Sequence, residues 1–174
     1  NKGRGINVGG LNNSIIRNSV FSFNSNSGIY TNRNTTIVNC TFYENSAAYG
    51  GGISIQQSSG SIIKNCIFWN NYASNSNGGE FSDVSSDYAP TVEYCLMQLG
   101  TLYGTGTGSI TNQNPLFVNA EQGDFRLLSG SPALDEGDNT AIAGVLTDIA
   151  GEERIQNSTV DMGAYEGVVT SLPR

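Results

Sequence analysis

Aromatic and basic side chains recur at fixed positions in this chain, where they could bind a carbohydrate. Tyr43 and Trp69 each directly follow a phenylalanine in similar segments, and Arg17 and Lys64 share another matching position. Aromatic rings pack on the apolar faces of sugars, and arginine or lysine can hold a uronate carboxylate. These four residues are the candidate ligand site. In the alternative interpretation, Tyr43 and Trp69 pack beneath a loop or beneath the C-terminal part of the chain.

Two acidic residues form a secondary hypothesis for a bound cation. Asp135 and Asp138 lie in the oxygen-rich stretch Asp-Glu-Gly-Asp-Asn, which resembles part of a calcium-binding loop. The stretch lacks the ligand spacing of a helix-loop-helix calcium site, and solvated acids near a helix end are the alternative. Calcium is the one cofactor considered, and no other is expected.

A second charged group lies near the C-terminus. Asp148, Arg154, Asp161 and Glu166 could form a substrate or calcium site, or a structural network. We favour the network, in which Arg154 bridges acids and Asp148 accepts hydrogen bonds from turn amides. The reason is that a loop-rich segment lacks the ladder hydrogen bonds of regular structure.

Several chemistries are excluded by composition. The chain has no histidine, which removes Ser-His-Asp and Cys-His nucleophiles and histidine-liganded zinc. Residues 1–79 contain Glu44 as their single acid, so they cannot supply the paired carboxylates of a glycosidase. No catalytic residue is assigned. Nucleic acid is not an expected partner because no basic cluster interleaves with aromatics, and no stretch could span a membrane.

The elements that position these side chains are short strands of an internal repeat. Each copy reads apolar, outward, Asn, small, outward, Phe, and the small Ser or Cys position recurs after 21, 26 and 29 residues. Such a period indicates a solenoid in which each repeat is one coil. The copies are Ile16–Phe21, Ile37–Phe42, Ile63–Phe68 and a degraded fourth, Val92–Met97.

The residue types predict an all-β fold, a right-handed single-stranded parallel β-helix. Apolar residues alternate with period two and are β-branched or aromatic, which favours strands. Parallel crossovers are right-handed, and equivalent residues of stacked coils lie about 4.8 Å apart. The phenylalanines should form one interior column. Bend asparagines such as Asn39 should tolerate a left-handed backbone and stack into an amide ladder.

The three cysteines share the small position of the repeat. Stacked parallel side chains have poor disulfide geometry, and three thiols cannot all pair. We expect Cys40, Cys66 and Cys95 to be buried thiols that act as small apolar residues.

Two parts follow one another along the chain. Residues 1–108 form about four coils, and residues 109–174 form a loop-rich capping module that covers the open end of the last coil or packs along its side. The chain begins in the middle of a coil pattern at Gly5. We therefore expect it to be the C-terminal piece of a longer, N-terminally truncated protein.

Short motifs in both parts resemble known bacterial surface proteins. The coils carry Gly-Gly-Gly-Ile and Phe-x-x-Asn, which resemble the repeats of chlamydial polymorphic outer-membrane proteins. The tail resembles the C-terminal region of choice-of-anchor β-helix proteins. Its five ordered blocks are Asn114–Phe117, Gly123–Leu127, Gly130–Ala133, Asp148–Arg154 and Asp161–Glu166.

The resemblances imply a pectate-lyase-like solenoid that is extracellular or on the cell surface at the outer membrane, anchored through a missing downstream segment. The main hypothesis is a non-catalytic stalk or adhesin that recognises a polysaccharide or a host-surface glycan. The alternative is the C-terminal part of a carbohydrate-active enzyme, a polysaccharide lyase or hydrolase, whose catalytic coils are absent from this chain.

Overall fold

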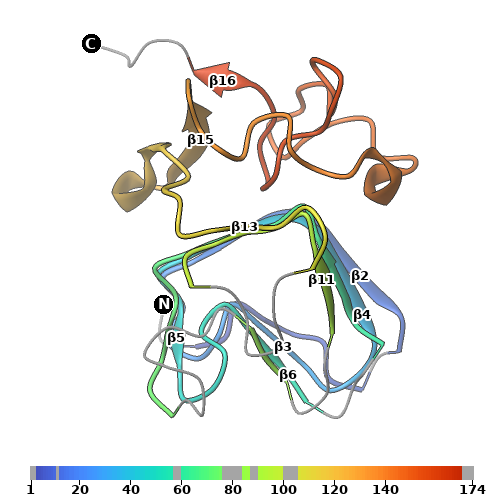
Figure 1. The fold of residues 1–174 in the computed structure, drawn as a ribbon. Helices are drawn as coiled ribbons and strands as arrows, with labels where there is room; N and C mark the ends of the chain where they lie inside the picture. The colour runs from blue at the N-terminus through green and yellow to red at the C-terminus, as the bar shows by residue number, and fades with distance from the viewer. Residues whose placement is uncertain are drawn as a thin grey trace.

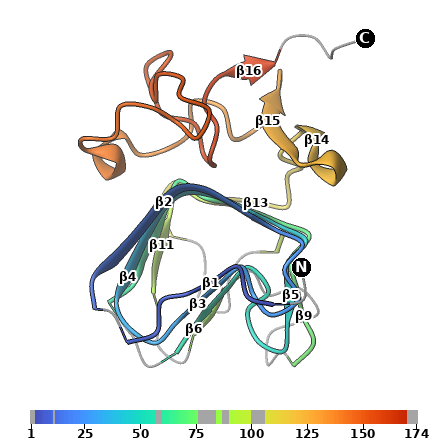
Figure 2. The same ribbon diagram turned by 180° about the vertical axis from the view of Figure 1, so that it is seen from behind.

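The computed structural model describes residues 3–10, 12–56, 60–75, 84–86, 90–99 and 106–169, and its first part is a stack of parallel coils. Figure 1 looks along the stack, and Figure 2 shows it from behind. One sheet holds β1 (Ile6–Asn7), β3 (Ile29–Thr31), β6 (Ile53–Ile55) and β10 (Val84–Ser86) in that order. A short pair joins β5 (Ser46–Ala47) to β9 (Tyr72–Ala73).

The larger sheet bends through the middle of each coil. It contains β2 (Ser14–Ser22), β4 (Thr35–Tyr43), β7 (Ile62–Lys64), β8 (Ile67–Trp69), β11 (Thr91–Glu93), β12 (Leu96–Met97) and β13 (Ile110–Thr111). Its strands pair in parallel, so the predicted register of the repeat is confirmed. The ladder reaches Thr111 through the pairing of β12 with β13.

The bend of each coil is a left-handed residue at the predicted position. Asn18, Asn39, Asn65 and Tyr94 have φ angles of 47°, 52°, 51° and 51°. Asparagine adopts this backbone at lower cost than most residues, and the fourth coil keeps the same bend with tyrosine. The bend turns the strand from one side of the coil to the next, which places Tyr43 and Trp69 at the ends of β4 and β8.

Phenylalanine rings fill the interior as one stacked column. The ring centroids of Phe21 and Phe42 are 5.2 Å apart, and those of Phe42 and Phe68 are 4.6 Å apart, with nearly parallel planes. Met97 pairs with Phe68 in the next register position and continues the column. Phe42 and Phe68 are fully buried, so the predicted core column is confirmed.

The cysteine column is also interior. Cys40, Cys66 and Cys95 are free thiols with no exposed surface. Each Sγ donates to the carbonyl two residues earlier, at 3.1–3.3 Å. Burial raises the pKa of the Cys66 thiol, which disfavours the reactive thiolate. The prediction of buried thiols in the core is confirmed.

The prediction that Asn39 belongs to an amide ladder is wrong. The ladder lies three residues beyond each phenylalanine, at Asn24, Asn45 and Asn71. Asn45 Oδ1 accepts from Asn24 Nδ2 at 2.8 Å, and Asn71 Oδ1 accepts from Asn45 Nδ2 at 2.9 Å. The Asn39 amide instead lies against Asp161 and Arg154 of the C-terminal module. The physical reason is that the module supplies the hydrogen-bond partners of this amide, the Asp161 carbonyl and the Arg154 guanidinium.

The C-terminal module, residues 112–169, contains little regular structure. Its sheet has the order β14 (Phe117–Asn119), β15 (Asp124–Leu128) and β16 (Val168–Val169), with β14 antiparallel and β16 parallel to β15. In the described part of the chain, no helix is long and apolar enough to cross a membrane. The described module also contains two 3-10 turns, η1 (Ala120–Gln122) and η2 (Asn139–Ile142).

The module packs along the side of the coils, over the row of bends (Figures 1 and 2). Asn18 Nδ2 donates to the Thr147 carbonyl at 2.7 Å. Asn65 exchanges two hydrogen bonds with the Asp138 backbone, at 2.7 and 3.0 Å. Of the two predicted placements, these contacts support the one along the side. The same asparagines that make the bends therefore hold the module in place.

Candidate functional site

Tyr43 and Trp69 are neighbours in register, but they do not form an open aromatic face. They pair as the last residues of β4 and β8. Tyr43 is only 6 % exposed, because the rings of Phe117 and Phe125 pack on it with centroids 6.1 and 5.4 Å away. Trp69 is half-buried at the edge of an apolar cluster shared with the module. Of the two interpretations of these rings, packing beneath the C-terminal part of the chain is confirmed for Tyr43, and an exposed aromatic face is wrong for it.

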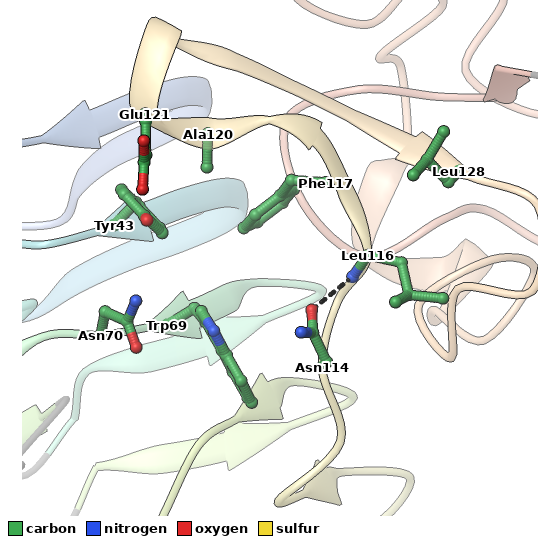
Figure 3. A pocket seen from close by; sticks show the side chains of 9 residues that line it. All are labelled: Tyr43, Trp69, Asn70, Asn114, Leu116, Phe117, Ala120, Glu121 and Leu128. Carbon is green, nitrogen blue, oxygen red and sulfur yellow. Dashed lines mark hydrogen bonds between the residues drawn. The ribbon is translucent and has the colours of Figure 1, made fainter. Parts of the chain in front are cut away.

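A pocket remains where the module leaves the coils. It has a volume of about 340 Å³, and Figure 3 shows it from close by. The coils contribute Tyr43, Trp69 and Asn70, and the module contributes Asn114, Phe117 and Glu121 together with two leucines. The pocket thus joins aromatic rings to amide and carboxylate groups, a combination suited to a small polar ligand with an apolar face.

The polar groups of the pocket are partly positioned by local hydrogen bonds. Asn114 Oδ1 accepts from the Leu116 backbone N–H at 2.8 Å, which fixes the Asn114 side chain. In Figure 3 the amide NH2 of Asn114 is turned toward Trp69, and Glu121 points toward Tyr43. Burial raises the pKa of the Tyr43 hydroxyl, which also interacts with Asn70 and Glu44. This hydroxyl therefore stays protonated and can donate a hydrogen bond at neutral pH.

The basic pair of the predicted ligand site lies elsewhere. Arg17 and Lys64 occupy one outward column with Val38 between them, before the bend rather than after it. Lys64 Nζ is 2.9 Å from a Glu93 carboxylate oxygen and 3.0 Å from Asp138 Oδ2. Hydrogen bonds to these two acids raise the pKa of Lys64. The structure therefore brings Tyr43 and Trp69 to the pocket but leaves Arg17 and Lys64 outside it.

The residues considered for calcium are engaged in other contacts. Asp138 Oδ1 accepts from the backbone N–H and hydroxyl of Thr140, and Oδ2 holds Lys64. Asp135 Oδ2 accepts from Asn157 Nδ2 at 3.0 Å. Within the described ranges, no three acidic or cysteine side chains gather in a way that could hold a metal ion.

The charged cluster near the C-terminus forms the structural network that we favoured. Arg154 is buried and donates to the carbonyl oxygens of Ala164, Asp161 and Gly163 at 3.2, 3.1 and 2.7 Å. Asp148 accepts from three backbone N–H groups, two of them in the turn that follows it. With its amide oxygen toward the guanidinium, Asn39 of the coils also accepts from Arg154. The cluster holds irregular backbone together and ties it to the coils.

Glu166 makes this network sensitive to pH. Its carboxylate accepts from the Asp161 backbone N–H and lies 3.6 Å from Arg154 Nε. Burial and the Asp161 carboxylate raise the pKa of Glu166 from 4.5 to about 8. Between these values the folded protein holds a proton that the unfolded chain releases. Stability must therefore fall as pH rises through this window.

We expect Glu166→Gln to flatten this pH dependence. Wild-type protein should lose on the order of a few kcal/mol between about pH 4.5 and pH 8, at about 1.4 kcal/mol per pKa unit. The neutral glutamine avoids that loss while keeping a carbonyl oxygen for the Asp161 N–H. Urea titrations at pH 5, 6.5 and 8 measure the slope, with the exposed Glu152→Gln as control. Parallel pH profiles for wild type and Glu166→Gln would contradict the prediction.

Sequence reasoning did not find the module's half of the pocket. Asn114 and Phe117 belong to the recognised block Asn-Pro-Leu-Phe. The spacing of residues in the sequence does not show which coil residues this block contacts. Glu121 lies in η1 between β14 and β15, outside any recognised block. The available signal for Glu121 in the sequence was an acid shortly after the Asn-Pro-Leu-Phe block.

The sequence of the described coils and of the start of the module matches a known protein family. A family model described as "Right handed beta helix region" matches residues 1–136. The match includes all the described coils and continues through β15, and it confirms the right-handed parallel β-helix predicted from the repeat. No curated protein and no solved structure matches the chain.

Proposed function

Because this chain belongs to the family of right-handed β-helix regions, we propose that it is a non-catalytic stalk of a bacterial surface protein that binds a carbohydrate beside Trp69. The observation that carries the proposal is the pocket at the junction of coils and module. Its volume of about 340 Å³ suits a sugar residue. The half-buried Trp69 can pack on the apolar face of a sugar ring, while amides and Glu121 meet its hydroxyls.

A stalk role rests on the stacking of the coils. Each coil contacts its neighbours through continuous parallel ladders and through the phenylalanine and asparagine columns. Such quasi-one-dimensional folds provide extended, rigid spacers. The surface location rests on the resemblance of the tail to choice-of-anchor proteins. The binding of a host-surface glycan or a polysaccharide would make the protein adhesin-like.

The number of acids that line the pocket favours a non-catalytic function. Hydrolysis of a glycosidic bond ordinarily needs two carboxyl groups on opposite sides of the bond. Among the described lining residues, Glu121 supplies one, and Glu44, which interacts with the Tyr43 hydroxyl, lies outside that lining. Binding without cleavage is therefore the simpler chemistry for this pocket.

A glycan array tests the proposal. Wild-type protein should bind a limited set of glycans, and Trp69→Ala should lose about tenfold or more in affinity, as expected when an aromatic sugar contact is removed. Tyr49→Ala removes an exposed aromatic ring from another part of the coils and serves as the matched control. Equal binding by wild type and Trp69→Ala, or no binding to any glycan, would overturn the carbohydrate proposal.

A further inference from the structure

The pocket beside Trp69 carries negative charge without a nearby cation among its described residues. Glu121 is the charged side chain of the lining, and it points toward Tyr43 in Figure 3. The Tyr43 hydroxyl also interacts with Glu44, so a second carboxylate lies close to the same ring.

The two basic residues of the predicted ligand site lie away from the pocket. Lys64 is held by Glu93 and Asp138 on the other side of the bend. Arg17 lies two positions further along the same column, past Val38. A uronate carboxylate in the pocket would therefore face Glu121 without compensation, and like charges at short range repel.

The remaining groups complete a site for a cation. Asn114 uses its oxygen on the Leu116 N–H, so its NH2 can donate to a sugar hydroxyl. The face of Trp69 attracts a cation as well as an apolar ring face. Glu121 can accept from an ammonium group as a charge-assisted hydrogen bond.

We infer that this pocket selects an amino sugar, a hexosamine residue with a free ammonium group, over neutral and acidic sugars. The inference rests on the proposed carbohydrate function and adds the ligand class. In the bound state the ammonium group lies at Glu121 and the apolar face of the ring lies on Trp69.

Three tetrasaccharides test the inference by isothermal titration at pH 6 and low salt. They are the tetramers of glucosamine, N-acetylglucosamine and galacturonic acid. Wild-type protein should bind the glucosamine tetramer about three- to tenfold more tightly than the acetylated one, as expected for one charge-assisted hydrogen bond. The galacturonate tetramer should bind more weakly than both.

The variant Glu121→Gln tests whether Glu121 causes the preference for the amino sugar. It should bring the two glucosamine-based tetramers to equal affinity, whereas Glu136→Gln, an exposed glutamate elsewhere in the module, should leave the preference unchanged. If free and acetylated tetramers bind equally to wild type, or if Glu121→Gln keeps the preference, the amino-sugar inference fails while the carbohydrate proposal stands. If no tetramer binds, the amino-sugar inference fails and the glycan array decides the carbohydrate proposal; if Trp69→Ala binds as well as wild type, both fail.

Discussion

Phe42→Ala should lower the free energy of unfolding by about 3–5 kcal/mol, the range for removing a fully buried aromatic ring. Phe42 has no exposed surface and is stacked between Phe21 and Phe68, at 5.2 and 4.6 Å. The lost ring leaves a cavity in the middle of the column, and its two stacking contacts are lost as well. Because Phe42 lies between neighbouring coils, both of them lose packing.

Two companion variants make this expectation specific. Phe21 is only partly buried and stacks on one side within the described chain, so Phe21→Ala should cost clearly less than Phe42→Ala. Phe42→Leu retains much of the volume and should recover a large part of the loss. Urea unfolding followed by far-UV circular dichroism measures all three. Equal losses at Phe21 and Phe42 would show that the stack does not contribute as a continuous column.

Arg154→Met should cost about 3–5 kcal/mol, as expected when one partner of a buried charge network is removed. Arg154 is 1 % exposed and binds three carbonyl oxygens, with Glu166, Asp148 and Asp161 nearby. Methionine fills part of the volume but leaves the Asp148 and Asp161 carboxylates without their cation and three carbonyl oxygens without a donor. The module should therefore loosen before the coils unfold.

The single tryptophan reports on this loosening. Trp69 packs at the boundary with the module, so its emission should shift to longer wavelength when the module separates. We expect Arg154→Met to show this shift at a lower urea concentration than the loss of β-sheet signal. Arg126→Met removes an exposed arginine paired with Asp124 and should leave both midpoints nearly unchanged. Coincident, wild-type-like transitions in Arg154→Met would contradict the assigned role of the network.

The pocket shows which features of the candidate site could be predicted from the sequence and which could not. Tyr43 and Trp69 were correctly placed one above the other, because their register follows from the repeat. Whether a ring at that position meets solvent depends on Phe117 and Phe125, which belong to a segment without any repeat. The same segment also decides the partner of Lys64, because Asp138 of the module pairs with it.

The two recurring asparagine positions, that of Asn39 and that of Asn45, also show what the sequence pattern leaves undecided. Both positions recur in every early coil, and the bend and the ladder were both expected at the position of Asn39. The structure assigns the ladder to Asn45 and its equivalents, and assigns Asn39 and Asn65 to contacts with the module. Local spacing does not reveal which side of the coil an amide faces once a left-handed residue has turned the chain.

The sequence alone determined the parallel coils, the phenylalanine and cysteine columns and the left-handed bends. These features depend on short periodic patterns, and each coil contacts only its neighbours, so a repeat in sequence becomes a repeat in space. Only the tertiary structure decided where the C-terminal module lies, which aromatic rings it covers and which charges it brings to the pocket. Those contacts join residues far apart in the chain through irregular backbone, whose path is set by specific hydrogen bonds and buried charges rather than by any period.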